Sequence, residues 1–494
     1  MMKRITRILA LALALLMLLP MVLACSKTSN DEDETSASVV TTGGDDLYDA
    51  NGYLKDSLPE LDFEGYEFKI LTWESGYGGD FYVPEDTGIA VEDEVYRRNL
   101  VVQERLNVKL SADFIEGGNS NQQSFVSNVS NNIMAGGTSP YDLIGSYSMS
   151  AGTLAMNGMC ANLNEFDYLD FEKPWWPEGI VEGSTFNGNL YFITGDLANS
   201  LIYNLYFLVV NKDMLAQLKL DDPREMVMDG TWTLDAMIEM TKNTYSDDDS
   251  ISGPSDGDIY GWGSHANVHY DSFLCASGIR ASAEDEQGIL RLTDDFTGQK
   301  THDLIVKINN WLHGSGDCYY GGESMTNFKL GKLLFSTYAA TDVIRVLKDA
   351  EIDYGIVPFP KYDEEQAQHY CNVSFQHSLL SVPITVRDGD VSAAVLECMG
   401  SEAYRSSAPF VFETMLKSRF SNDALDGEMY DILKANVYVD ATRLFSSSFT
   451  FAQSAVGMFR YSINDNKSTW MSDIGTYKRT INDILKNITT TMNG

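Results

Sequence analysis

Residues 186–215 read FNGNLYFITGDLANSLIYNLYFLVVNKDML and hold the richest strand signals of the chain. The dipeptide Asn187-Gly188 is typical of a tight β-hairpin turn, and a short strand is expected to follow it over Leu190–Thr194. Leu205–Asn211 is an almost unbroken apolar run, which is typical of a strand buried on both faces of its sheet. The middle of the chain therefore contributes a central strand to a well-covered sheet.

The region before this stretch alternates between strand and helix patterns. Strands are expected over 63–73, 107–115 and 141–145, and helices over 93–106 and 124–135. In the first helix, one face can be built from Val95, Leu100, Val101 and Leu106. Strand, helix, strand, helix, strand is the order of a parallel α/β sheet.

The region after it gives a second set of elements. Thr231–Thr241 has the pattern of an amphipathic helix with Thr233 as its N-cap. Strand signals follow over 328–337 and 354–360, a helix is expected over 391–399, and the remainder is mainly helical. Two sets of this size indicate two α/β bodies rather than one with an appendage.

The N-terminus has the features of an export leader. Lys3, Arg4 and Arg7 precede an apolar stretch over 8–24, which is short for a membrane helix, and this stretch ends at Cys25. Ala24-Cys25 resembles the bacterial lipobox, so residues 1–24 are expected to be removed and Cys25 lipidated; a plain signal peptide is the alternative. Residues 25–62 are expected to be a flexible acidic linker, because Ser26–Asp46 has almost nothing to bury.

Composition excludes several classes of partner. The chain of 494 residues has 71 acidic and 35 basic side chains and a net charge of −36. Nucleic acid and anionic lipid surfaces are bound through excess Lys and Arg, so neither is expected as a partner. Beyond Cys25 there are five cysteines without a CxxC pair, Cys160, Cys275, Cys318, Cys371 and Cys398. These cysteines either form one or two disulfides or are small buried thiols.

Several stretches, taken in order, resemble the extracellular solute-binding proteins of ABC importers, in the branch of the maltodextrin-binding proteins. They are FKILTW, MAGGTSPYDLI, ANLNEF, the 186–215 stretch, TWTLDAM, NFKLGKLLFSTYAATDVI and YGIVPFPKY. The resemblance implies an α/β, periplasmic-binding-protein-like two-lobe fold of type II, with the ligand cleft between the lobes. Lobe 1 would comprise 63–195 and 380–420, and lobe 2 would comprise 196–379 and 421–494.

The same resemblance implies a monomeric, lipid-anchored receptor without catalytic residues, metal or cofactor. It would capture a carbohydrate outside the cell and deliver it to the permease subunits of an ABC importer. A secreted glycan hydrolase, or the same fold with a peptide or another polar solute, remains open. The chain has neither a GxSxG nor an HExxH motif.

Ligands of open α/β sheets bind beyond the carboxyl ends of the strands. Residues expected there combine aromatic faces with hydrogen-bonding tips, as a pyranose requires. They are Trp73, Glu74, Ser146, Tyr147, Asp196, Asn199, Trp262, His265, Tyr338, Asp342, Phe375, Gln376 and His377.

Three further features have two interpretations each. Trp175-Trp176 is either a stacking platform for a longer sugar or a plug at the edge of a lobe. His265 and His269, spaced i, i+4 beside Asp271, either bind zinc or share this spacing by chance. The Asp247–Asp249 and Asp256–Asp258 runs either form a solvated loop or hold calcium, although they lack the EF-hand order.

Overall fold

The computed structural model describes residues 47–76, 79–249, 251–411, 424–450 and 454–492. The predicted leader and Cys25 lie outside these residues. Contacts divide the chain into two compact units, Met1–Leu54 and Lys55–Gly494. In the first unit, the described residues form a turn in which Asp49 accepts hydrogen bonds from the backbone N–H groups of Asn51 and Tyr53. The second unit contains all the sheets.

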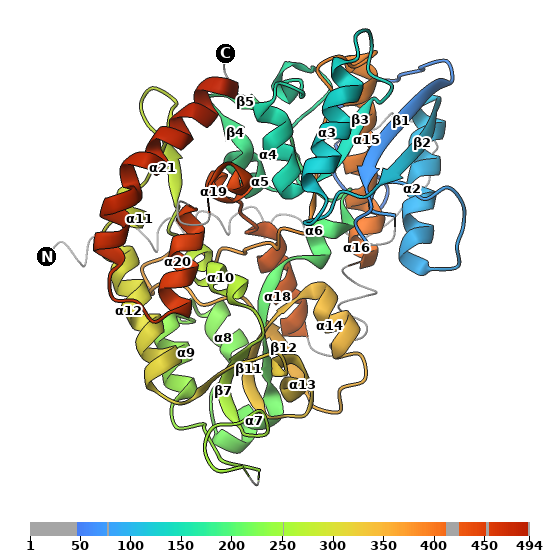
Figure 1. Ribbon diagram of the computed structural model, residues 1–494. Helices are drawn as coiled ribbons and strands as arrows, with labels where there is room; N and C mark the ends of the chain where they lie inside the picture. Colours follow the sequence, from blue (N-terminus) through green and yellow to red (C-terminus); the bar gives the residue numbers. More distant parts are fainter. Residues whose placement is uncertain (1–46, 77–78, 250, 412–423, 451–453, 493–494) are drawn as a thin grey trace, which may run out of the picture. The chain divides into compact units, whose positions relative to one another are not determined.

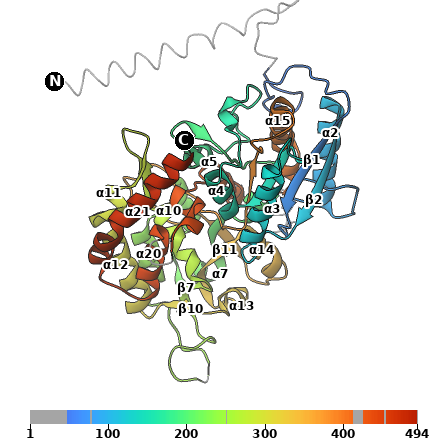
Figure 2. The ribbon, with the colours of Figure 1, turned by 45° about the horizontal axis from the view of Figure 1, so that its top comes forward.

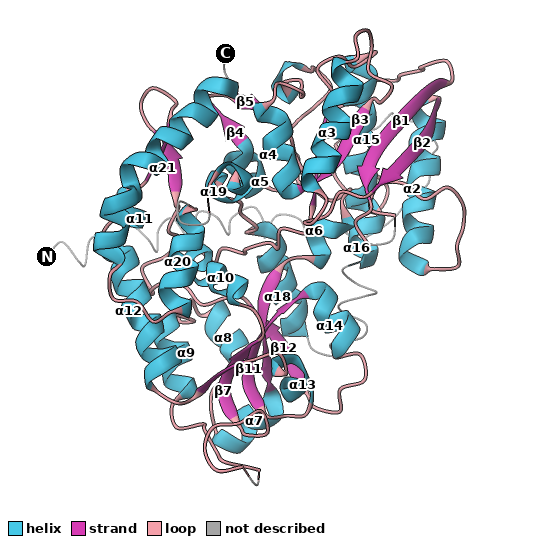
Figure 3. Ribbon diagram, in the orientation of Figure 1, coloured by secondary structure: helices cyan, strands magenta, loops and turns pink. Residues whose placement is uncertain are grey.

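The first sheet has the strand order β13-β3-β1-β2. Its parallel strands are β1 (Tyr66–Trp73), β2 (Val108–Ile115) and β3 (Leu143–Tyr147). The strand β13 (Ser378–Ser381) joins antiparallel to β3, so that Ser378 pairs with Tyr147. Figure 3 shows these strands as one group, separate from the strands of the second sheet. The expected strand–helix alternation is confirmed, with one returning strand at the edge.

The second sheet has the order β10-β7-β11-β6-β12. Its bounds are β6 (Tyr206–Asn211), β7 (Tyr260–Ser264), β10 (Cys318–Tyr320), β11 (Leu333–Ala339) and β12 (Tyr354–Val357). β7, β10 and β11 run parallel, and β6 runs against its neighbours β11 and β12. Every residue of β6 is buried, as its apolar run predicts. The α/β fold class is therefore confirmed.

Two short segments carry the chain between the sheets. Ile193 forms an isolated bridge with Leu380 beside the first sheet, and β6 of the second sheet begins at Tyr206. On the return, Val373 pairs with Leu205, and β13 of the first sheet begins at Ser378. The helix α6 (Asn199–Tyr203) lies within the first of these passages. The boundaries of the two lobes themselves stay a prediction.

Helices cover both sheets (Figure 1). Near the first sheet lie α2 (Ala90–Leu106), α3 (Gln122–Met134), α4 (Ser148–Met156), α5 (Glu178–Ser184), α15 (Gly389–Arg405) and α16 (Ser407–Phe410). Near the second lie α7 (Lys212–Leu218), α8 (Pro223–Met228), α9 (Leu234–Thr241), α10 (Asp271–Ala276), α12 (Gln299–Gly314), α13 (Ser324–Lys329), α14 (Ala340–Val346) and α18 (Ala424–Ala435).

The C-terminal part is helical, as expected. It contains α19 (Ala441–Leu444), α20 (Ala455–Asn464) and α21 (Trp470–Met492). α21 packs against α11 (Asp294–Thr297), α12 and the hairpin of β8 (Ser282–Glu284) and β9 (Leu290–Leu292). Figure 2 shows α21 beside α11 and α12. No helix among the described residues is both long enough and apolar enough to span a membrane.

Local sequence signals are confirmed at several places and wrong at others. Asn187 and Gly188 have φ values of 49° and 76° and connect β4 (Thr185–Phe186) to β5 (Asn189–Leu190). The strand expected over Leu190–Thr194 is limited to β5 and the bridge at Ile193. Phe328 belongs to α13 rather than to the following strand. The five cysteines in the described part are free thiols, which supports the second interpretation of them.

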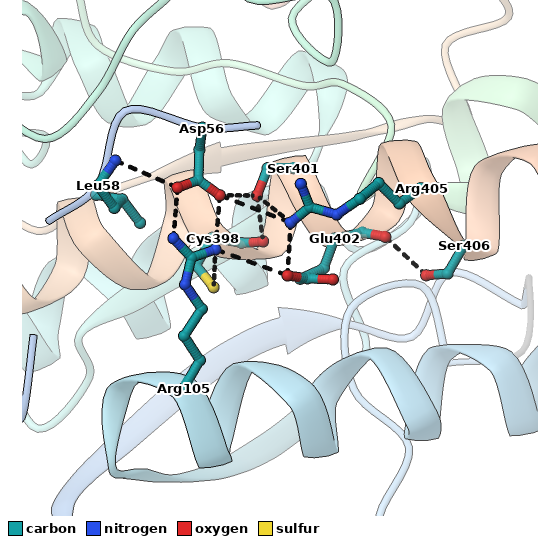
Figure 4. A network of polar contacts seen from close by, with 8 residues as sticks. All are labelled: Asp56, Leu58, Arg105, Cys398, Ser401, Glu402, Arg405 and Ser406. Atoms are coloured by element: carbon teal, nitrogen blue, oxygen red, sulfur yellow. Dashed lines mark hydrogen bonds and ion pairs between the residues drawn. The ribbon is translucent and has the colours of Figure 1, made fainter. Parts of the chain in front are cut away.

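The segment after the linker is anchored by a buried aspartate (Figure 4). Asp56, which the sequence assigns to the linker, accepts hydrogen bonds from Arg105 of α2 at 2.7 and 2.5 Å and from Ser401 of α15. Burial raises the pKa of Asp56, but these hydrogen bonds outweigh it and hold the pKa below its usual value. The second compact unit begins at Lys55, within the segment expected to be linker, and the linker boundary at residue 62 stays a prediction.

The tryptophan pair Trp175-Trp176 is almost completely buried, which supports its interpretation as a plug. The indole of Trp176 donates a 3.0 Å hydrogen bond to the carboxylate of Glu397 in α15. Burial raises the pKa of Glu397 to about 7, although the bond from Trp176 lowers it. A glutamate in an unfolded chain titrates near 4.5.

This raised pKa predicts a pH-dependent stability. The folded state holds the Glu397 proton more tightly than the unfolded chain does. This proton therefore stabilises the fold fully below about pH 4.5, and the stabilisation is lost as the pH rises to 7. Relative to Glu397→Gln, the wild type should lose on the order of 3 kcal/mol of unfolding free energy between these pH values. Urea denaturation across this range measures it. Exposed Glu364→Gln is the control, and a pH-independent difference between wild type and Glu397→Gln would refute the prediction.

Candidate functional site

The edges at which the parallel strands of the two sheets end lie in one region of the second unit. β1, β2 and β3 are parallel, so Trp73, Ile115 and Tyr147 end at the same edge. In the second sheet, the carboxyl end of β11 lies beside the start of β6, because Ala339 pairs with Tyr206. Polar and aromatic residues that follow these ends can therefore contact one ligand.

A cavity of about 590 Å³ lies at this place. Its walls combine residues from the carboxyl ends of the first sheet, from the passages between the sheets and from the C-terminal helices. They are Trp73, Gly118, Asn119, Tyr147, Met149, Tyr206, Val268, Ser374, Phe375, Gln376, Ser446, Ser454 and Arg460. Four aromatic rings and several amide or hydroxyl groups thus face one volume, which is large enough for a small saccharide.

Trp73 is held in place by a chain of hydrogen bonds. Its indole Nε1 donates to Ser378 Oγ at 2.8 Å, and its ring meets that of Tyr147 edge to face at 5.2 Å. Ser378 Oγ in turn donates to Asp80 at 2.6 Å, and Asp80 also accepts from the backbone N–H and hydroxyl of Ser200 in α6. Trp73 is therefore fixed by both passages between the sheets.

Phe375, another residue of the cavity wall, lies beside a cluster of charged side chains. The guanidinium of Arg443 lies 4.1 Å from the centre of the Phe375 ring and donates to Asp271 at 2.6 Å. Arg460 donates to the same carboxylate through Nε at 2.9 Å. Asp271 is thus committed to two arginines, so it is not available to complete a zinc site with His265 and His269.

Four of the predicted site residues line the cavity, namely Trp73, Tyr147, Phe375 and Gln376. Ser146 and Tyr338 do not reach it, because β3 and β11 each run two residues further than expected. Ser146 Oγ donates to the backbone carbonyl of Leu379, and the Tyr338 hydroxyl donates to the backbone carbonyl of Met325. Trp262 lies within β7 and packs against Trp311 in the core. All three residues lie outside the wall of this cavity.

The remaining predicted residues are placed near the passages or on the surface. Asp196 is buried in an ion pair with Lys434 at 2.9 Å, and Asp342 pairs with Arg345. The His377 ring bonds the Ser374 carbonyl, while Glu74 is exposed. Asn199 is buried in α6, and neither atom of its amide has a hydrogen-bond partner among the described residues. None of these five is part of the cavity wall.

His265 packs edge to face on His269 at 4.6 Å, and Ser264 Oγ lies 2.7 Å from Nδ1 of His269. Burial lowers the pKa of both rings. Among the described residues, the acidic group that could hold a metal is Asp247, Asp249 and Asp258. Asp258 accepts hydrogen bonds from Tyr245, Asp248 and Ser255, so its carboxylate already organises the loop.

A second cavity, of about 700 Å³, is larger but differs in position. It is bordered by residues 171–174, 176–178, 181 and 182 and by Tyr404, Asp431, Lys434 and Ala435, none of which belongs to a strand. Because it is not at the carboxyl ends of the strands, we take the 590 Å³ cavity as the candidate site.

No protein-family model matches the chain, and no curated protein matches it. Solved structures match over most of its length. The cyclic alpha-maltosyl-1,6-maltose binding protein of Arthrobacter globiformis matches with a TM-score of 0.56 and 12% identity, over 86% of this chain and 100% of that one. The ABC substrate-binding protein Lmo0181 of Listeria monocytogenes, in complex with cycloalternan, matches with a TM-score of 0.51 and 11% identity, over 85% and 98%.

The chain has the fold of the ABC substrate-binding proteins. UgpB of Mycobacterium tuberculosis, in complex with glycerophosphocholine, shares this fold with a TM-score of 0.53 and 14% identity, over 85% of this chain and 98% of that one. These matches confirm the predicted fold. The identity of the ligand has to be argued from the cavity.

Asn119 was missed by the sequence analysis although it follows β2, and the strand-end rule would have found it. Ser446, Ser454 and Arg460 were missed for a different reason, because they come from the helical C-terminus, where no strand marks the site.

Proposed function

We propose that the chain is a lipid-anchored, extracellular solute-binding protein that captures a carbohydrate and delivers it to an ABC importer. The cavity at the facing carboxyl edges of the two sheets carries this proposal. Aromatic rings such as Trp73 and Phe375 suit the C–H face of a sugar, and Gln376, Asn119 and the serines suit its hydroxyls. Of the three fold relatives named above, one is a binding protein for cyclic alpha-maltosyl-1,6-maltose, one is in complex with cycloalternan, and UgpB is in complex with glycerophosphocholine.

The polar groups of the cavity wall indicate how a sugar would be bound. The described residues of this wall include no Asp or Glu. The sugar hydroxyls would therefore be bound by amides and hydroxyls, whereas the carboxylates Glu74, Asp196 and Asp342 have other positions.

Thermal-shift and calorimetric titration with a panel of mono- and oligosaccharides tests the proposal. We expect at least one saccharide to raise the melting temperature and to be recovered intact by chromatography after release. Consumption of the saccharide would instead indicate a hydrolase. A response to peptides alone would keep the fold and reject the carbohydrate.

The anchor has its own prediction. Cys25→Ser removes the thiol that lipidation requires, so the protein should move from the membrane fraction to the medium of its host. Immunoblotting of the fractions measures this. Substitution of Ser26 by Ala is the control, and membrane retention of Cys25→Ser would refute the lipid anchor.

A further inference from the structure

The charge of the cavity is opposite to the charge of the chain. The protein carries a net charge of −36, and acidic side chains outnumber basic ones two to one. Of the described residues that line the 590 Å³ cavity, Arg460 alone is charged. The cavity wall therefore carries a positive charge, whereas the chain as a whole is strongly negative.

Asp271 holds Arg460 so that part of its guanidinium can still donate hydrogen bonds to a ligand. Its Nε donates to Asp271 Oδ1 at 2.9 Å, and its Nη2 donates to Oδ2 of the same carboxylate. Nη1 makes no hydrogen bond within the described part of the chain, and the side chain remains 16% exposed. The Nη1–Nη2 end of the fork can therefore donate to a second acceptor.

Asp271 does not neutralise this wall. Its carboxylate also binds Arg443 at 2.6 Å, and Arg443 donates its other nitrogen to the Val373 carbonyl at 2.8 Å while it lies over the ring of Phe375. Two guanidinium groups thus share one carboxylate, which leaves one excess positive charge beside the cavity. The nearby His265 and His269 add none, since burial lowers the pKa of both.

We propose that the ligand is an acidic saccharide, and that the carboxylate of a uronic acid unit binds the free end of the Arg460 guanidinium. This inference rests on the proposed function and narrows its substrate class. Arginine matches a planar carboxylate with two parallel hydrogen bonds. The rings of Trp73, Tyr206 and Phe375 would contact the sugar ring that carries the carboxylate.

Calorimetric titration of the full chain with matched saccharides tests this. The probes are oligogalacturonides and oligoglucuronides, their neutral galactose and glucose counterparts, and glucose 6-phosphate. We expect a uronate to bind at least tenfold more tightly than its neutral counterpart at low salt, with affinity falling as sodium chloride is added. Arg460→Gln should weaken uronate binding at least tenfold and the binding of the neutral counterpart much less, and Arg460→Lys should be intermediate.

A variant with the opposite effect keeps the test independent of misfolding. Asp271→Asn raises the positive charge of the wall, so it should tighten uronate binding severalfold. Arg97→Gln is the matched control, because Arg97 is an exposed arginine on α2, paired with Glu94. Neutral sugars bound by the wild type as tightly as the matching uronates would overturn the acidic ligand but keep the proposed function. Binding of the phosphate alone would overturn the carboxylate, and no saccharide binding at all would overturn both.

Discussion

Trp73→Ala should weaken saccharide binding at least 100-fold in calorimetric titration. Trp73 ends β1 at the cavity, and its position is fixed by Ser378 and by the ring of Tyr147. A rigid aromatic face of this kind loses no freedom when a sugar packs on it, and removing such an anchor costs roughly 3 kcal/mol, which corresponds to about 100-fold in affinity. The effect is large because Trp73 has the largest of the four aromatic rings that line the cavity.

A conservative pair of variants separates binding from stability. Trp73→Phe keeps a ring but removes the indole N–H bond to Ser378, and we expect about a tenfold loss of affinity. Trp311→Phe is the matched control, since Trp311 is also buried and donates its indole N–H to Thr241 at 2.8 Å, but it does not line the cavity. Equal losses of affinity in both variants would show that Trp73 acts only through folding.

Asp80→Ala should lower the free energy of unfolding by about 3–5 kcal/mol, as expected when one member of a buried polar network is removed. Asp80 accepts hydrogen bonds from Ser200 in α6 and from Ser378 in β13, so it joins the two passages between the sheets. Burial raises the pKa of Asp80, and the bonds from Ser378 and Ser200 and the charge of Arg98 oppose this. Loss of the carboxylate leaves these buried donors without their acceptor.

Guanidinium denaturation measures the change, and calorimetry adds a second readout. Because Ser378 holds the indole of Trp73, Asp80→Ala should also weaken saccharide binding. The control is Asp285→Ala, since Asp285 accepts hydrogen bonds from the backbone of Gln287 and Ile289 but lies at the surface hairpin of β8 and β9. A loss for Asp80→Ala no greater than that for Asp285→Ala would contradict the structural role of the network.

The fold could be predicted from the sequence where local patterns and burial agree. The apolar run Leu205–Asn211 became the fully buried β6, and Thr233 caps α9 by accepting a hydrogen bond from the N–H of Ala236. In α2 the pattern was misleading. Leu100 and Val101 are 44% and 45% exposed, whereas Arg98 is buried and donates to the Leu197 carbonyl, a partner that lies 99 residues away.

The candidate site was predicted only in part. The residues that line the cavity depend on where each strand ends and on how the C-terminal helices pack against the sheets. Trp73 and Phe375 follow from the rule that ligands bind beyond strand ends. Tyr338 was misplaced by a two-residue error in the end of β11, which turns an exposed edge into core. Arg460 could not be found, since α20 reaches the cavity through tertiary packing that no local pattern records.

Hydrogen–deuterium exchange with and without a bound saccharide tests the central claim most directly, namely that a sugar is held at the facing carboxyl edges of the two sheets. Binding should slow exchange in the described segments around Gly118–Asn119, Ser374–Gln376 and Ser454–Arg460, which come from distant parts of the chain. Slowed exchange confined to residues 171–182 and α18, at the other cavity, would contradict the account.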